Sequence, residues 1–224
     1  MDPLTHSPAS SLQVLFEGLL ATPSTPLPYQ ADVGLRSFLL QRPASNVIVY
    51  NSPALTSSAG DIQDAGGADR LLVNHWHEAM LFGQPGLDVP TFVSERDRGE
   101  TARSMHIAGT FTGRQMIDDD LEAIPTPGHT AGTTSYLWDN GSHRFLFTGD
   151  FIWIEHGEWK AVVIDEGLRG DYLDSLALVH QLDFDVLVPW GTTTGDPFFA
   201  IADRVEIHTR IDAITARVEA GGDR

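Results

Sequence analysis

The sequence contains no cysteine among its 224 residues. Disulfide bonds, thiolate metal ligands and a cysteine nucleophile are therefore all excluded. Any metal site has to be built from histidine and carboxylate side chains, which makes the nine histidines the residues to follow.

Basic residues are also scarce. The chain has 14 Lys and Arg and 31 Asp and Glu, which gives a formal net charge of -17. Lys160 is the one lysine. Nucleic-acid binding depends on cationic side chains that neutralise phosphates, and anionic membrane surfaces attract the same side chains. We therefore expect a small-molecule substrate, with neither a nucleic acid nor a membrane as a partner.

Long apolar runs are absent as well. No stretch of about 18 apolar residues occurs, and the chain does not start with a basic region followed by an apolar one. On these grounds we expect a cytoplasmic protein. Hydrophobic residues make up 42% of the chain, which suits one globular domain over residues 1–224, with residues 1–10 as a flexible lead-in.

Short β-rich segments dominate the first part of the chain. Residues 11–20 indicate a first strand, and residues 21–30, with their prolines, indicate a loop. Residues 36–41 and 46–51 are two apolar segments joined by a short polar link, which predicts a hairpin.

The later part of the chain mixes strands with helices. Asp139-Asn140-Gly141 predicts a hairpin between residues 133–138 and 143–148, because Asn and Gly accept positive φ. Apolar residues at helical spacing predict helices in residues 170–182 and 198–218.

A histidine pair lies at the end of one predicted strand. Residues 71–75 are a short apolar run that predicts a buried strand, and the sequence continues as His75-Trp76-His77. Side chains two residues apart on an extended backbone point to the same side, so these imidazoles can share one metal ion. A lone His-X-His pair also occurs often without a metal.

Two further motifs place polar side chains in loops. Residues 126–134 read TPGHTAGTT, a loop by its Gly, Pro and Thr content, and carry His129. Residues 146–150 read LFTGD and put Asp150 directly after a predicted strand, where functional groups are often found. Taken singly, each is more often an ordinary turn.

In this order the three motifs resemble those of the metallo-β-lactamase superfamily. That family carries a His-X-His-X-Asp-His motif after a short buried strand, then a Thr-Pro-Gly-His-Thr-X-Gly-Ser loop, then a strand ending in Thr-Gly-Asp. The second motif is nearly complete as TPGHTAGTT, and the third is complete as LFTGD. The resemblance covers roughly residues 30–195 and implies an α/β (α+β) fold, an αββα four-layer sandwich.

The resemblance also implies a ligand set. In the family two metal ions lie side by side, and the first is held by the His-X-His pair and the loop histidine, with the late aspartate bridging. Matched residue by residue, these ligands are His75, His77, His129 and Asp150. We expect Asp150 and His129 to serve catalysis too, since Asp150 can hold the attacking water.

The sequence departs from the family at the second metal ion. Ala79 and Met80 stand where the family motif has Asp and His, and Trp190-Gly191 ends the late strand where the family has Pro-Gly-His-Gly. Alanine and methionine cannot replace a carboxylate and an imidazole around a hard or borderline cation. We therefore predict one Zn²⁺ on three imidazoles, with Fe²⁺ in a two-His, one-carboxylate triad as the alternative. Trp190 is expected to fill the volume of the second site.

These expectations leave three functions open. The first is a mononuclear metallohydrolase of a small ester, thioester or lactone, in which water activated by the metal is the nucleophile. The second is a mononuclear Fe(II) oxygenase, since persulfide dioxygenases of this superfamily use iron. The third is a degenerate, non-catalytic member that binds a ligand or partner through an inherited pocket. The intact first metal site favours the first function.

A few remaining polar residues also carry expectations. Glu78 is expected to be a solvated carboxylate, with a role as base as the alternative. Asp118-Asp119-Asp120 is expected to be a solvated turn. His106 and His156 lie near predicted loops on the side of the site, and either could enter its pocket.

Overall fold

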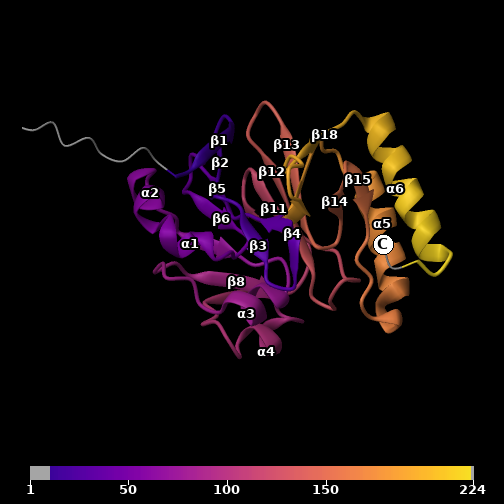
Figure 1. Ribbon diagram of the computed structural model, residues 1–224, viewed down its shortest axis with the longest axis horizontal. Coiled ribbons are helices and arrows are strands. Elements are labelled where there is room, and N and C mark those ends of the chain that lie inside the picture. The colour runs from indigo at the N-terminus through magenta and orange to yellow at the C-terminus, as the bar shows by residue number, and fades with distance from the viewer. Residues whose placement is uncertain (1–10, 223–224) are drawn as a thin grey trace, which may run out of the picture.

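The computed structural model describes residues 11–222 and is built around two large sheets (Figure 1). In spatial order the first sheet consists of β1 (Gln13–Phe16), β2 (Leu19–Ala21), β5 (Phe38–Leu40), β6 (Val47–Val49), β7 (Arg70–Leu72), β8 (Thr91–Ser94) and β9 (Gly109–Phe111). The second consists of β10 (Gln115–Asp118), β11 (Leu121–Pro125), β12 (Thr134–Asp139), β13 (Arg144–Gly149), β16 (Val186–Pro189) and β18 (Ala200–Ile201).

Helices cover the outer face of each large sheet. Those on the side of the first sheet are α1 (Ala54–Ser57), α2 (Ala59–Asp64), α3 (His77–Phe82) and α4 (Arg98–Thr101). Those on the side of the second are α5 (Arg169–Gln181), which follows the 3-10 turn η1 (Glu166–Leu168), and α6 (Arg204–Glu219). The layers run helices, sheet, sheet, helices, so the expected αββα sandwich is confirmed. Within the described residues no helix has the length and apolar character needed to cross a membrane.

Strand alternation sorts the apolar side chains into the layers between these elements. On β12, Tyr136 and Trp138 pack between the two sheets, whereas Leu137 packs under α5 and α6. On β6, Val49 faces the layer between the sheets, and Ile48 faces the helices of the first side. The period of two along a strand thus gives each large sheet two buried faces.

A third, smaller sheet lies beside the two large ones and was not expected. Its order is β15 (Glu158–Lys160), β14 (Trp153–Glu155), β17 (Gly191–Thr193), β4 (Gln30–Leu35) and β3 (Thr25–Leu27). Residues 21–30 are therefore not simply a loop, because β3 pairs with β4 as an antiparallel hairpin. Pro26 is tolerated in β3 because that strand is at the edge of the sheet.

Other predictions of local structure are confirmed or adjusted at their boundaries. The hairpin of β5 and β6 and that of β12 and β13 form as predicted. Residues 11–20 form a hairpin instead of one strand, because Gly18 takes a φ of 75° and turns the chain between β1 and β2. Helix α6 starts at Arg204, since Asp203 accepts a capping hydrogen bond from the Glu206 N–H. The expected flexible lead-in, residues 1–10, lies outside the described residues.

Candidate metal centre

The His-X-His pair lies at a turn, not on a strand. Strand β7 ends at Leu72, and Trp76 has helical backbone angles of -66° and -18° directly before α3 begins at His77. The expectation of two side chains alternating on an extended backbone is therefore wrong. The turn into α3 nevertheless brings the rings of His75 and His77 to 5.0 Å between their centroids.

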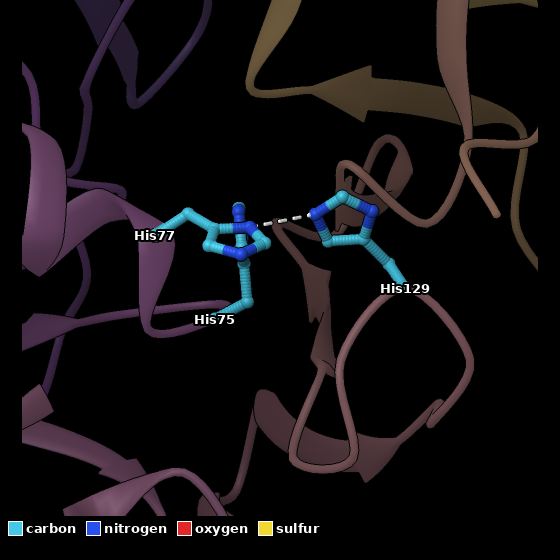
Figure 2. A group of neighbouring side chains, drawn as sticks. All are labelled: His75, His77 and His129. Atoms are coloured by element: carbon cyan, nitrogen blue, oxygen red, sulfur yellow. Dashed lines mark hydrogen bonds between the residues drawn. The ribbon is translucent and has the colours of Figure 1, made fainter. Parts of the chain in front are cut away.

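Three imidazoles converge from two distant segments of the chain (Figure 2). His129 comes from the loop between β11 and β12, and its Nε2 lies 3.0 Å from Nδ1 of His77. One ring nitrogen from each of His75, His77 and His129 lies within 4.8 Å of the other two. Donors at this spacing could hold one metal ion.

Hydrogen bonds on the far side of two rings determine which nitrogen faces the centre. The Nδ1 of His129 lies 2.9 Å from the Val162 carbonyl oxygen, which can only accept, so Nδ1 carries the proton. The Nδ1 of His75 lies 2.9 Å from Oδ1 of Asn74. The Asn74 amide nitrogen is occupied with two carbonyl groups, so Oδ1 accepts from His75. Both rings therefore direct an Nε2 lone pair towards the centre, as in metal sites whose ligands are oriented by outer partners.

The donor set fits a metal ion. Nε2 of His75 is buried without a hydrogen-bond partner, which is costly unless another group satisfies it. Burial lowers the pKa of His75 well below its usual value, of His77 to about 3 and of His129 to about 4, and the neighbouring imidazoles add to the effect for His75 and His77. The three rings are thus neutral at neutral pH, the state in which imidazole binds metals.

Asp150 joins this centre from the end of β13. Its Oδ2 lies 3.5 Å from Nε2 of His75 and 3.7 Å from Nε2 of His129. The side chain is 22% exposed, and burial raises the pKa of its carboxyl to about 7. A cation beside the carboxylate would favour the ionised form. All four residues predicted from the sequence therefore lie together.

Glu78 is neither solvated nor available as a base, so both expectations for it are wrong. Its side chain is fully buried and accepts backbone N–H groups from Asn51 at 2.6 Å, Asn74 at 2.7 Å and His75 at 3.4 Å. Burial raises its pKa to about 8, although these hydrogen bonds act in the opposite direction. Glu78 ties the turn that carries His75 to the loop after β6.

Asp97 is a buried residue of the site that sequence reasoning missed. Its carboxylate accepts the Trp76 N–H at 3.1 Å, the Thr130 hydroxyl at 2.7 Å and the Gly132 N–H at 2.8 Å. It therefore joins the turn of the His-X-His pair to the loop of His129. Burial raises its pKa, and the hydrogen bonds oppose that shift. No motif marks Asp97, because it lies in a charged segment and only the fold buries it.

Tyr172 of α5 holds the loop of His129 from outside. Its hydroxyl donates to the Phe151 carbonyl and accepts the N–H of Val162 at 3.0 Å, the residue whose carbonyl orients His129. Gly128 packs against the Tyr172 ring so closely that a Cβ at Gly128 would lie 2.5 Å from it. Tyr172 therefore hydrogen-bonds to Phe151, the residue after Asp150, and to Val162, the residue bonded to His129.

Two other buried tyrosines also hydrogen-bond to main-chain groups at or near strand ends. Tyr50 accepts the N–H of Gly149 and donates to the Val188 carbonyl, both at 2.7 Å. Tyr136 donates to the Val73 carbonyl at 2.7 Å. Main-chain groups next to Asp150 and near His75 are therefore satisfied by side chains from the core.

The positions expected to lack the ligands of a second metal ion offer none in the structure. Ala79 is fully buried among the apolar residues between the first sheet and its helices, and Met80 is 53% exposed. Trp190 is buried, donates from Nε1 to the Asn51 carbonyl at 3.0 Å, and packs edge-on against His75 with 5.4 Å between ring centroids. An indole therefore occupies the space beside the histidine centre.

The remaining expectations have mixed outcomes. Asp118 and Asp120 do not form a simply solvated turn, because both pair with the fully buried guanidinium of Arg42. His106 and His156 are not among the described residues that line the cleft beside Asp150.

Comparison with known proteins identifies the family of the chain. The sequence model of the metallo-beta-lactamase superfamily matches residues 57–191. A curated relative, the beta-lactamase-like protein 2 homolog of Caenorhabditis elegans, is 27% identical over 169 residues, which cover 72% of this chain and 54% of that protein. The chain thus spans about half the length of that relative.

Solved structures share the fold at low sequence identity. The DIM-1 metallo-beta-lactamase aligns with a TM-score of 0.67 and 14% identity, covering 94% of this chain and 97% of the other. A metallo-beta-lactamase of Cronobacter sakazakii aligns with a TM-score of 0.64, the same identity and the same coverage. At this identity the likeness shows the fold alone.

Proposed function

The chain belongs to the metallo-β-lactamase superfamily, and from this premise we propose that it is a metal-dependent hydrolase of a small ester, thioester or lactone. One metal ion, zinc in the first instance, is held by His75, His77 and His129. The observation that carries the proposal is the group of three neutral imidazoles within 4.8 Å, one of which has a buried Nε2 without a hydrogen-bond partner.

The chemistry follows from the donor set and from Asp150. A zinc ion on three imidazoles supplies Lewis acidity and brings the ionisation of water into the neutral range. Asp150, with Oδ2 3.5 Å from His75, orients the attacking water and takes its proton. Hydrolysis breaks the bond between the acyl carbon and oxygen or sulfur, adds hydroxyl to the acyl carbon, and returns a proton to the leaving group.

A single metal ion is proposed because the second donor set is missing. Ala79 has no donor atom, and Trp190 offers an N–H that is already bonded to Asn51. This combination supports one site and disfavours reactions that need two adjacent cations. The net charge of -17 supports a small-molecule substrate over a nucleic acid or a membrane.

Fe²⁺ is the second candidate for the same centre. His75, His129 and Asp150 form a two-histidine, one-carboxylate group, with Oδ2 of Asp150 at 3.5 and 3.7 Å from the two imidazoles. Such a triad suits a non-haem Fe(II) oxygenase.

Metal analysis of protein purified without added metal tests the proposal. We expect about one zinc per chain, lost in His129→Ala and kept in the control His143→Ala, whose imidazole pairs instead with Asp185 at 2.6 Å. Iron at the same stoichiometry would support the oxygenase. No metal under any loading condition would leave only a non-catalytic role.

Hydrolysis assays follow on the loaded protein. A panel of small esters, thioesters and lactones should show turnover that disappears with a chelator and in His129→Ala. A loaded protein that hydrolyses none of these classes would contradict the proposed reaction.

A further inference from the structure

A small cleft with a volume of about 70 Å³, partly open to solvent, adjoins the histidine centre. Leu27, Val33 and Leu35 of the β3–β4 hairpin line one wall, and Trp153 and Trp190 line another. Aliphatic and aromatic side chains therefore form much of the wall, and Gln30 and Asp150 add polar groups.

The cleft is continuous with the proposed reaction centre. Asp150 belongs to its lining and lies 3.5 Å from His75. Val162, another lining residue, orients His129 through its carbonyl oxygen, and Trp190 packs edge-on against His75. A molecule in the cleft can therefore place one end at Asp150, the lining residue next to the imidazoles, and much of its remainder against apolar side chains.

The charges of the cleft select against anions. Among the described residues that line it, none is cationic, and Asp150 is acidic. Away from the proposed metal, a carboxylate placed against these walls would lose hydration without gaining a cationic partner, which is costly. An aliphatic or aromatic group would bury apolar area, at roughly 25 cal/mol per Å².

We propose that this cleft binds the uncharged, apolar acyl group of the substrate, so that the enzyme accepts esters and thioesters of simple aliphatic or aromatic acids. Acyl groups that carry a further carboxylate are rejected. Trp190 is the residue that makes this possible, because its indole forms apolar wall beside His75 where the family pattern has a histidine. The inference rests on the proposed function for the identity of the substrate, but not for binding by the cleft.

A binding experiment tests the cleft independently of catalysis. The probe is N-methylhexanamide, an uncharged amide that resists hydrolysis, and its partner is the N-methyl monoamide of adipic acid, which ends in a carboxylate. Calorimetry or ligand-observed NMR is run on metal-free wild-type protein. We expect the uncharged probe to bind at least about tenfold more tightly, since the carboxylate must be desolvated. Equal affinity, tighter binding of the charged probe, or no binding of either overturns the proposal.

A charge introduced at the rim locates the binding site. Gln30 lines the cleft and is half-buried, so Gln30→Arg should improve the relative affinity of the carboxylated probe at least threefold. Gln115→Arg makes the same charge change at an exposed position on β10 and should leave the ratio unchanged. The same ratio in both variants would place the probe elsewhere and overturn the assignment. Binding without metal or hydrolysis would instead contradict the proposed function alone.

Discussion

The Nδ1–H of His129 donates to the carbonyl oxygen of Val162 at 2.9 Å, and this bond determines which ring nitrogen points into the site. The Val162 N–H is in turn bonded to the hydroxyl of Tyr172. A ligand of the proposed metal is therefore oriented by a helix on the outer side of the second sheet. Changing such an outer partner alters metal affinity while all the ligands stay in place.

Replacing Tyr172 by Phe should weaken zinc binding by up to about tenfold, the lower end of the cost of losing an outer partner, because Tyr172 acts on His129 through Val162. The variant removes the hydroxyl that holds Val162 and Phe151 but keeps the ring against Gly128. Chelator competition measures the affinity, and circular dichroism checks the fold. The control is Thr215→Val, which removes a hydroxyl bonded within α6. Unchanged zinc affinity in Tyr172→Phe would show that the loop of His129 keeps its conformation without the Tyr172 hydroxyl.

Gly149→Ala should destabilise the protein strongly. Gly149 has a φ of 58°, and a Cβ there would lie 1.9 Å from Oδ1 of Asn74, the atom that orients His75. Backbone strain and overpacking each cost about 1–3 kcal/mol, so denaturant unfolding should show at least that loss. Gly113→Ala is the control, since a Cβ at that position meets no atom within 4 Å. A Gly149→Ala protein as stable as wild type would contradict the close approach.

Asp97→Ala should loosen both histidine-bearing segments together. The buried N–H of Gly132 and the half-buried N–H of Trp76 would lose their acceptor, and a buried unsatisfied group costs about 1–3 kcal/mol. We expect lower unfolding free energy and weaker metal binding in the same variant. Asp119→Ala, an exposed aspartate, should change neither quantity. If Asp97→Ala loses stability but keeps its metal affinity, Asp97 supports only the fold.

Arg42 should make stability depend on pH at the acid end. Burial by itself would raise the pKa of Asp120, but the hydrogen bonds and charge of Arg42 outweigh it and lower the pKa below the ordinary 3.8. A depressed carboxyl pKa stabilises the fold above the unfolded value and loses that contribution as pH falls through the folded value. Wild type should therefore lose stability below about pH 4.

Arg42→Gln removes that dependence as well as the ion pair. Its unfolding free energy should be lower at neutral pH and should change less than that of wild type between about pH 4 and 2. Urea unfolding across this range measures both. Arg103→Gln, which removes an exposed pairing with Glu100, should follow the wild-type curve. Parallel curves for Arg42→Gln and wild type would contradict the assignment.

The fold was largely predictable because its signals are local. The turn Asp139–Gly141 and the apolar alternation of β12 and β13 are properties of neighbouring residues, and the structure confirms their hairpin. The sheet of β3, β4, β14, β15 and β17 was not predictable, since its strands are short and come from distant parts of the chain. Pairing of that kind depends on long-range contacts that no local pattern records.

The site, like the fold, was predictable only in part. The absence of cysteine restricted any metal ligands to nitrogen and oxygen, and short motifs identified His75, His77, His129 and Asp150. The tertiary structure decided the rest: a turn in place of an extended strand, a buried Glu78 and the links made by Asp97. The physical reason is burial. A carboxylate in a charged segment becomes an acceptor for buried N–H groups only when distant elements exclude water from it, and residue type alone does not state which elements those are.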